Sequence, residues 1–188
     1  MSRLTPDDVL LGLLKAQPAH GYELLETFRD PAHLGHIWNM STSQLYAVLK
    51  RLEEGGLIAG AEVPQPNAPA RVEYRLTERG EARLEGWLAE PLPPTSIHRI
   101  RVQFLSRLYI AALLARPADA IITRQLLACQ KQLTKTQAER GRTNSPIKAL
   151  TLDFVIGQLE ACIAWLHHCQ AHPLPNPGSV HQTKEENN

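Results

Sequence analysis

Residues 41–60, STSQLYAVLKRLEEGGLIAG, constrain the fold most strongly, because they predict a capped helix that turns directly into a strand. Ser41 and Gln44 have the Ser-x-x-Gln spacing of a capping box, in which each side chain bonds the other residue's backbone N–H. Gly55 or Gly56 supplies the left-handed residue that ends such a helix. Apolar residues recur at the i, i+3, i+4, i+7 spacing of one buried helical face: Leu45, Val48, Leu49 and Leu52.

A β-hairpin is predicted directly after this helix. Residues 57–63 read as one strand, and residues 71–76, RVEYRL, alternate between apolar and charged side chains as a second strand. Three prolines within residues 64–70 predict an irregular loop between the two strands. Thr77 then caps a further helix that runs to about residue 90.

Two shorter helices are expected upstream, over residues 6–16 and 20–29, followed by an irregular segment over residues 31–40. Three helices, a hairpin and a fourth helix, in this order, form a winged helix-turn-helix. Residues 1–90 are therefore predicted to be a winged helix-turn-helix domain.

The rest of the chain is predicted to be wholly helical. Residues 91–96, PLPPTS, form a stiff linker and the expected domain boundary. Residues 97–172 follow as an all-helical dimerisation domain, and residues 173–188 as a polar disordered tail. The helices expected in this domain span residues 97–115, 118–140 and 147–171. The predicted fold is mainly α with a small β-hairpin wing.

The last of these helices contains the most apolar long run of the sequence, residues 149–169. Asp153 and Glu160 lie within it, and each would cost roughly 2.5–3.5 kcal/mol near a bilayer centre, so a buried soluble helix is predicted rather than a membrane span. Its apolar circumference is larger than one small domain can cover, which indicates a homodimer. Three cysteines and no signal peptide favour a reducing, cytoplasmic location.

The helix over residues 41–54 has an exposed side that can meet DNA. Residues 1–90 hold nine Lys and Arg against thirteen Asp and Glu, so the domain as a whole is not basic. A helix N-terminus binds phosphate through free N–H groups without Lys or Arg, and small polar side chains there can approach base edges. The polar residues predicted to contact DNA on these grounds are Ser41, Thr42, Ser43 and Gln44. The basic residues predicted to contact DNA are Lys50, Arg71 and Arg75.

A second interpretation is a winged-helix protein-interaction module that binds no operator. Catalysis is not expected, because the sequence has neither a glycine-rich phosphate loop nor a serine nucleophile elbow. No cofactor is predicted.

Three motifs together resemble the PadR family of transcriptional regulators: HGYEL (20–24), STSQLYAVLKRLEEGGLI (41–58) and YRLTERG (74–80). The resemblance implies a dimeric, cytoplasmic, usually repressing regulator of bacterial genes, with Tyr22 and Tyr46 near the DNA backbone. It also implies small-molecule effectors, some of them aromatic, for which Trp87 and Trp165 are the candidate contacts. Family members often carry Arg or Lys just before the wing tyrosine, where this chain has Val72 and Glu73.

A two-fold dimer would place two recognition helices in successive major grooves about 34–36 Å apart, so the expected operator is palindromic. Four residues near the end of the last helix allow two interpretations: Cys162, His168, Cys169 and His172. Their i, i+3 and i, i+4 spacings suit a metal site, but buried cysteines and histidines at a helix C-terminus are also ordinary structural choices. No metal site is assigned.

Overall fold

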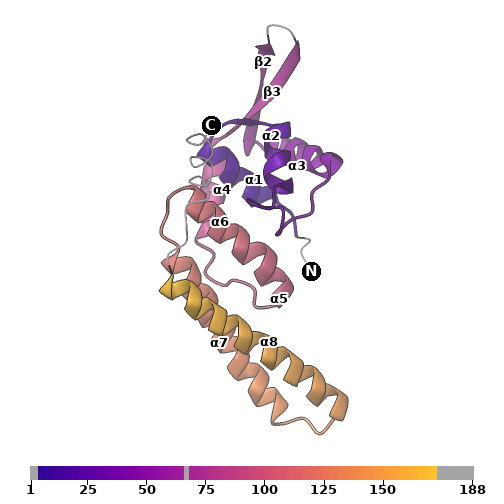
Figure 1. Cartoon of the computed structure of the whole chain (residues 1–188), viewed down its shortest axis with the longest axis vertical. Coiled ribbons are helices and arrows are strands. Elements are labelled where there is room, and N and C mark those ends of the chain that lie inside the picture. The colour runs from indigo at the N-terminus through magenta and orange to yellow at the C-terminus, as the bar shows by residue number, and fades with distance from the viewer. Residues whose placement is uncertain (1–3, 66–67, 173–188) are drawn as a thin grey trace, which may run out of the picture.

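The computed structural model describes residues 4–65 and 68–172. It places a winged-helix head at one end and a long helical hairpin at the other (Figure 1). The head contains α1 (Asp7–Ala16), β1 (Ala19–His20), α2 (Gly21–Arg29), α3 (Thr42–Glu54), β2 (Ile58–Gln65), β3 (Ala68–Leu76) and α4 (Glu78–Leu88). After the linker come α5 (Ile97–Arg99), the π-helix η1 (Ile100–Phe104), α6 (Leu105–Leu113), α7 (Asp119–Arg140) and α8 (Pro146–Ala171). The predicted fold class is confirmed.

The ends of α3 follow the sequence signals. The backbone N–H of Gln44 donates to Ser41 Oγ at 3.2 Å, and the N–H of Ser41 donates to Gln44 Oε1 at 2.9 Å. Such a cap contributes about 1 kcal/mol to helix stability. Gly56 has a φ of 64°, a left-handed conformation that costs glycine little, and it turns the chain toward β2. The four apolar residues predicted to form the buried face of α3 are all buried.

The wing is longer than predicted. β2 and β3 pair from Ile58↔Leu76 out to Gln65↔Ala68, so the prediction of an irregular loop over 64–70 is wrong, and residues 66–67 lie outside the described residues. Proline interrupts a ladder least at an edge strand or a bulge. Pro64 meets both conditions, because β2 is an edge of the β1-β3-β2 sheet and the register shifts between Val63 and Gln65.

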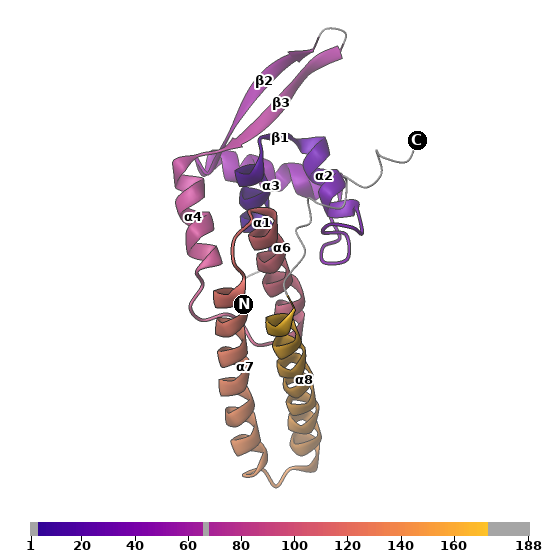
Figure 2. The ribbon, with the colours of Figure 1, turned by 60° about the vertical axis from the view of Figure 1, so that its left-hand side comes forward.

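The sheet also has a third strand that the sequence did not predict. β1 is two residues long and pairs antiparallel with β3, with Ala19 opposite Tyr74 and His20 opposite Glu73. This pairing joins the start of α2 to the base of the wing (Figure 2).

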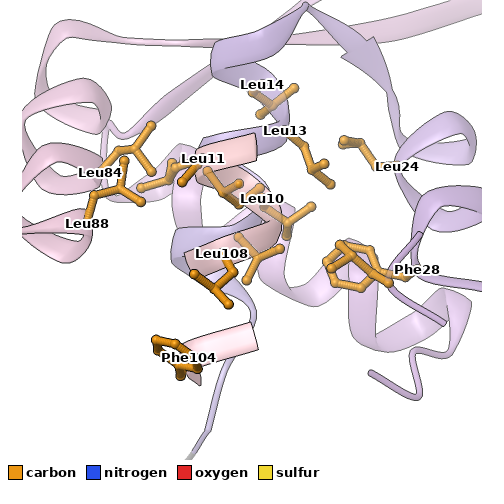
Figure 3. Close-up of a cluster of buried hydrophobic side chains, with 14 of the residues drawn as sticks. Leu10, Leu11, Leu13, Leu14, Leu24, Phe28, Leu84, Leu88, Phe104 and Leu108 are labelled. Atoms are coloured by element: carbon orange, nitrogen blue, oxygen red, sulfur yellow. The ribbon is translucent and has the colours of Figure 1, made fainter. Parts of the chain in front are cut away.

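One hydrophobic core continues from the head into the segment after the linker. α6 packs on α1, and Leu108 lies near Leu10 in the cluster of Figure 3, with Phe104 of η1 beyond it at the end of the cluster. Trp38 Nε1 donates a hydrogen bond to Ser106 Oγ at 2.9 Å, which ties the turn after α2 to α6. Although α6 follows the linker, it completes the core of the head.

The single helix predicted over residues 97–115 is instead divided into α5, η1 and α6. Ile100 and Phe104 are buried as expected, but Val102 is buried as well. A regular α-helix does not place residues i, i+2 and i+4 on one face, whereas the wider π turn brings more of its circumference inward. A periodicity of 3.6 residues gives no signal for this turn.

α7 and α8 form an antiparallel hairpin that extends away from the wing (Figure 2). Near the turn, Arg140 Nε lies 2.7 Å from Asp153 Oδ1. At the other end, Gln170 Nε2 lies 3.5 Å from Thr123 Oγ1. These two contacts fix the register of the hairpin.

The prediction that α8 is a buried helix is wrong for the single chain. Only 22% of its most apolar window is buried, although the helix is long and apolar enough to cross a membrane by length and composition alone. Its buried residues are Leu159, Cys162 and Leu166. Large apolar residues exposed along it are Ile147, Leu150, Phe154 and Trp165.

Candidate nucleic-acid interface

Three of the residues predicted to contact DNA line one hollow at the base of the wing. Tyr22 of α2, Tyr46 of α3 and Arg71 of β3 surround a volume of about 520 Å³. Both tyrosines are unusually exposed for aromatic residues, at 62% and 47%. The remaining lining residues are His20, Gly21, Val72 and Tyr74.

Two hydrogen bonds between a side chain and the backbone fix the elements around this hollow. His20 Nδ1 lies 3.0 Å from the carbonyl oxygen of Val72, so the first residue before α2 is fixed to the wing. Gly60 of β2 donates its N–H to Glu53 Oε1 at 2.9 Å, which fixes the end of α3 to the other strand. Burial raises the pKa of Tyr74, with further contributions from the nearby Glu53 and Tyr46, so its phenol stays neutral at physiological pH.

Of the polar side chains at the N-terminus of α3, two form the helix cap and two make other contacts. Ser41 and Gln44 are both engaged in the capping box, which leaves them less free to bind a ligand. Thr42 Oγ1 accepts a hydrogen bond from Arg29 Nη2 at 3.2 Å, and Ser43 Oγ lies 3.2 Å from Ser41 Oγ. Arg29 was not predicted as a site residue. Its position in the last turn of α2 gave no sequence signal for its approach to α3.

The three predicted cations differ in their pairing. Lys50 Nζ lies 3.8 Å from Glu54 on the same exposed helical face. Arg75 is held by Glu73, with Nε and Nη2 at 3.0 and 2.8 Å from the same carboxylate oxygen. Within residues 4–65 and 68–172, Arg71 has no ion-pair partner. Arg71 is therefore the wing cation most available to a phosphate.

The acidic excess of the head is partly neutralised on α1 and α4, away from the hollow. Asp7 forms an ion pair with Arg51, and Arg83 Nε lies 2.7 Å from Asp8 Oδ1. Lys15 of α1 pairs with Glu81 of α4. Thus the domain, although acidic overall, leaves Arg29, Lys50, Arg71 and Arg75 exposed.

The two candidate effector tryptophans lie where the head meets the helical segment. The guanidinium of Arg107, a buried residue of α6, lies 5.4 Å from the ring centre of Trp87. Trp165 of α8 meets Phe104 edge-on, with ring centres 5.8 Å apart.

The cysteines and histidines weighed as a metal site do not converge. The rings of His168 and His172 stack with centres 4.0 Å apart, and His172 Nδ1 lies 2.9 Å from the carbonyl oxygen of His168. Across the described part of the chain, no group of three or more His, Cys, Asp or Glu residues is gathered in a way that could hold a metal ion.

Comparison with known proteins agrees with the motifs. A family model, described as the transcriptional regulator PadR-like family, matches residues 10–86. The negative transcriptional regulator PadR of Bacillus subtilis (strain 168) is 30% identical over 131 residues, which are 68% of this chain and 69% of that one. The probable transcriptional regulator Rv1176c of Mycobacterium tuberculosis is 32% identical over 90 residues, 48% of this chain and 46% of its own.

Among solved structures, B. subtilis PadR in complex with operator DNA is 25% identical, with a TM-score of 0.44 and coverage of 88% of this chain and 96% of that chain. The family match and the B. subtilis relative confirm the resemblance seen in the sequence, and with it a transcriptional regulator rather than an enzyme. The chain belongs to the PadR-like family of transcriptional regulators.

Proposed function

We propose that the protein is a dimeric repressor that binds a palindromic operator through α3 and the wing, and that a small aromatic effector releases it. The observation that carries the DNA-binding part is the hollow shared by Tyr22, Tyr46 and Arg71 beside the tip of α3. Two exposed phenols and an unpaired guanidinium form a surface that suits a phosphate backbone, while the adjacent helix enters the major groove. The predicted contacts of Ser41, Thr42, Ser43, Gln44, Lys50 and Arg75 belong to this proposal.

The test of this part is fluorescence anisotropy on DNA from the protein's own promoter region at several salt concentrations. Replacing Lys50, Arg71 and Arg75 together by Ala should weaken binding and reduce the magnitude of the salt slope by about two to three units. The matched control replaces Lys131, Lys135 and Arg142, which removes the same charge from the second half of α7 and the turn after it. Equal losses for the two triple variants would contradict the assignment.

The exposed stripe of α8 supports the dimeric part of the proposal. Leu150 and Phe154 are each 66% exposed, and Ile147 and Trp165 continue the stripe along the helix. A second copy of the same helix would cover this surface, as self-complementary two-fold interfaces do. Asp153 lies on the same helix and forms an ion pair with Arg140 of α7, which favours a partner protein over lipid.

Light scattering after size exclusion tests the dimer. Leu150→Glu together with Phe154→Glu should yield a folded monomer, because neither side chain belongs to the core of the single chain. Gln130→Glu on the exposed side of α7 is the control and should remain dimeric. A dimer that persists in the double variant would place the interface elsewhere.

The effector part rests on kinship with B. subtilis PadR, which has also been solved in complex with p-coumaric acid. Trp87 and Trp165 supply aromatic surface where the head meets the helices. A planar ligand bound there would change the position of the head relative to the helices. Adding p-coumaric acid and related aromatic acids to the protein–DNA complex should lower anisotropy and quench tryptophan fluorescence. Trp87→Phe and Trp165→Phe identify which ring reports binding. Retention of the complex at saturating acid would refute this effector class.

A further inference from the structure

Cys129 of α7 and Cys162 of α8 meet inside the helical hairpin. Both are buried, at 0% and 5% exposure, and the two thiols lie close enough for each to shift the pKa of the other. The hairpin register agrees, because both cysteines lie between the Arg140–Asp153 contact and the Thr123–Gln170 contact. By this register Cys129 lies opposite Ala164, two positions from Cys162, so the two cysteines lie within about one turn of each other on packed helices.

The polar surroundings of Cys129 stabilise a thiolate. The hydrogen bond from the Cys162 thiol, opposed by burial and assisted by Gln125, lowers the pKa of Cys129 to about 7. The same pairing raises the pKa of Cys162, so the two thiols share one proton at neutral pH. Gln125 Nε2 donates to Cys129 Sγ at 3.5 Å and to the carbonyl oxygen of Pro94 at 3.0 Å.

A small reagent can reach this pair from one side. Cys162 lines an apolar hollow of about 230 Å³ between the segment that starts α5 and the inner face of α8. The hollow is wide enough for a molecule the size of a peroxide, and Val155 and Leu159 form part of its wall. Cys169 is only partly buried and lines a different hollow, beside Pro117 and Asp119.

We propose that Cys129 and Cys162 are an oxidation site at which a hydroperoxide converts two thiols into an intramolecular disulfide. Transfer of the shared proton to Cys129 leaves the thiolate on Cys162, at the hollow. That thiolate attacks a peroxide oxygen, so an S–O bond forms, the O–O bond breaks, and hydroxide leaves as water after taking up a proton. Cys162 is then a sulfenic acid.

Cys129 completes the reaction. It loses its proton to solvent, and its thiolate attacks Cys162 Sγ. The S–S bond forms, the S–O bond breaks, and the second hydroxide leaves as water. The sulfurs lose two electrons in total, and the peroxide is reduced to two waters. In a reducing compartment, structural disulfides are rare. A Cys129–Cys162 disulfide in such a compartment would form in response to oxidant and be reversed by thiol reductants.

The bond would also act on the linker. Gln125 bridges Cys129 and Pro94, and its Oε1 is buried with no hydrogen-bond partner within the described residues. Oxidation replaces a thiolate acceptor with a weaker disulfide sulfur, so it changes the hydrogen bonding of a side chain that connects Cys129 to the segment between α4 and α5.

Hydrogen peroxide on the reduced, full-length protein tests the proposal. Titration of thiols should fall from three to one per chain, and the intact mass should decrease by two hydrogens. A peptide map without reductant should join the peptides that carry Cys129 and Cys162, and dithiothreitol should restore all three thiols. The oxidised protein should also unfold at a higher urea concentration than the reduced protein.

Cys169→Ser is the matched control, because it removes the third thiol and should leave the internal disulfide unchanged. Neither Cys129→Ala nor Cys162→Ala should gain an internal link, and Cys129→Ala should stop at the sulfenic acid of Cys162, with a mass gain of one oxygen. The proposal is overturned if the wild-type chain gains oxygen atoms without losing hydrogens, or if the mapped bond joins Cys169 to a second chain. Neither readout involves DNA, so this result is independent of the proposed regulatory function.

Discussion

Gly21 lies so close to Tyr46 that a Cβ atom at position 21 would be 2.9 Å from the tyrosine hydroxyl oxygen. The first residue of α2 and an exposed ring of α3 therefore touch across one wall of the hollow below the wing. The glycine of HGYEL sets the position of the tyrosine in the recognition helix.

Gly21→Ala should displace this ring while leaving the head folded. The ring is half-exposed and can rotate, so the free energy of unfolding should change by less than about 1 kcal/mol. Operator affinity should fall about fivefold, as expected for one lost phosphate contact of about 1 kcal/mol. Anisotropy and thermal melts measure the two effects. If affinity is unchanged, the position of Tyr46 is not important for binding.

Two glycines of α4 provide a matched pair for stability. A Cβ at Gly80 would be 2.0 Å from the carbonyl oxygen of Leu57, whereas one at Gly86 would meet nothing within 4 Å. Gly80→Ala should destabilise the protein by about 2 kcal/mol or more, since the backbone must shift. Gly86→Ala should stabilise it by about 0.5–1 kcal/mol through helix propensity. Urea unfolding at one pH measures both, and equal effects would contradict the close contact.

The Glu85–Arg116 ion pair should make a small pH-dependent contribution to stability. Both guanidinium Nη atoms lie 2.7 Å from carboxylate oxygens, and this bond lowers the pKa of Glu85. A lowered folded-state pKa stabilises the fold above the unfolded pKa and loses that effect as pH falls through the folded pKa. Because both side chains are over one-third exposed, the contribution should be about 0.5 kcal/mol at pH 7.

Urea unfolding of Glu85→Gln and of the wild type between pH 7 and pH 4 measures the contribution of this ion pair to the free energy of unfolding. The difference should narrow steadily as the solution becomes more acidic. A difference that stays constant with pH would mean that packing, not charge, accounts for it.

The position of α6 predicts where the chain can be shortened. A fragment that ends at Glu90 would lack Leu108 and Phe104 and so would expose Leu10 and other residues of the same core cluster (Figure 3). Each large side chain exposed in this way costs about 1.5–3 kcal/mol, a large share of a small domain's stability. A fragment ending at Arg116 retains α6 and should melt cooperatively, whereas the shorter one should not. Circular dichroism melts of both fragments decide between these outcomes.

Local signals explain which parts of the fold were predictable. The α3 cap needs only Ser41 and Gln44, and its buried face needs only an i, i+3, i+4, i+7 pattern, so neither depends on the rest of the chain. β1 is too short for any periodicity, and it exists because Ala19 and His20 meet β3. The π turn and the packing of α6 on α1 likewise arise from contacts between distant segments.

The candidate site divides in the same way. The face of α3 followed from periodicity, and Tyr22 was named only through the family resemblance. That Tyr22, Tyr46 and Arg71 share one hollow depends on three separate elements, which no spacing along the chain encodes. Arg29 was missed for the same reason, since its guanidinium meets Thr42 across a turn of irregular backbone.

Because α6 completes the core of the head, the chain passes from the head to the hairpin through the turn between Leu113 and Asp119, not through the linker after α4. In the proposed dimer, the distance between the two recognition helices is then a property of the hairpin interface, not of the linker at residues 91–96. Substitutions along α8 could therefore retune the spacing of operator half-sites over evolutionary time, while the residues that read the DNA stay the same.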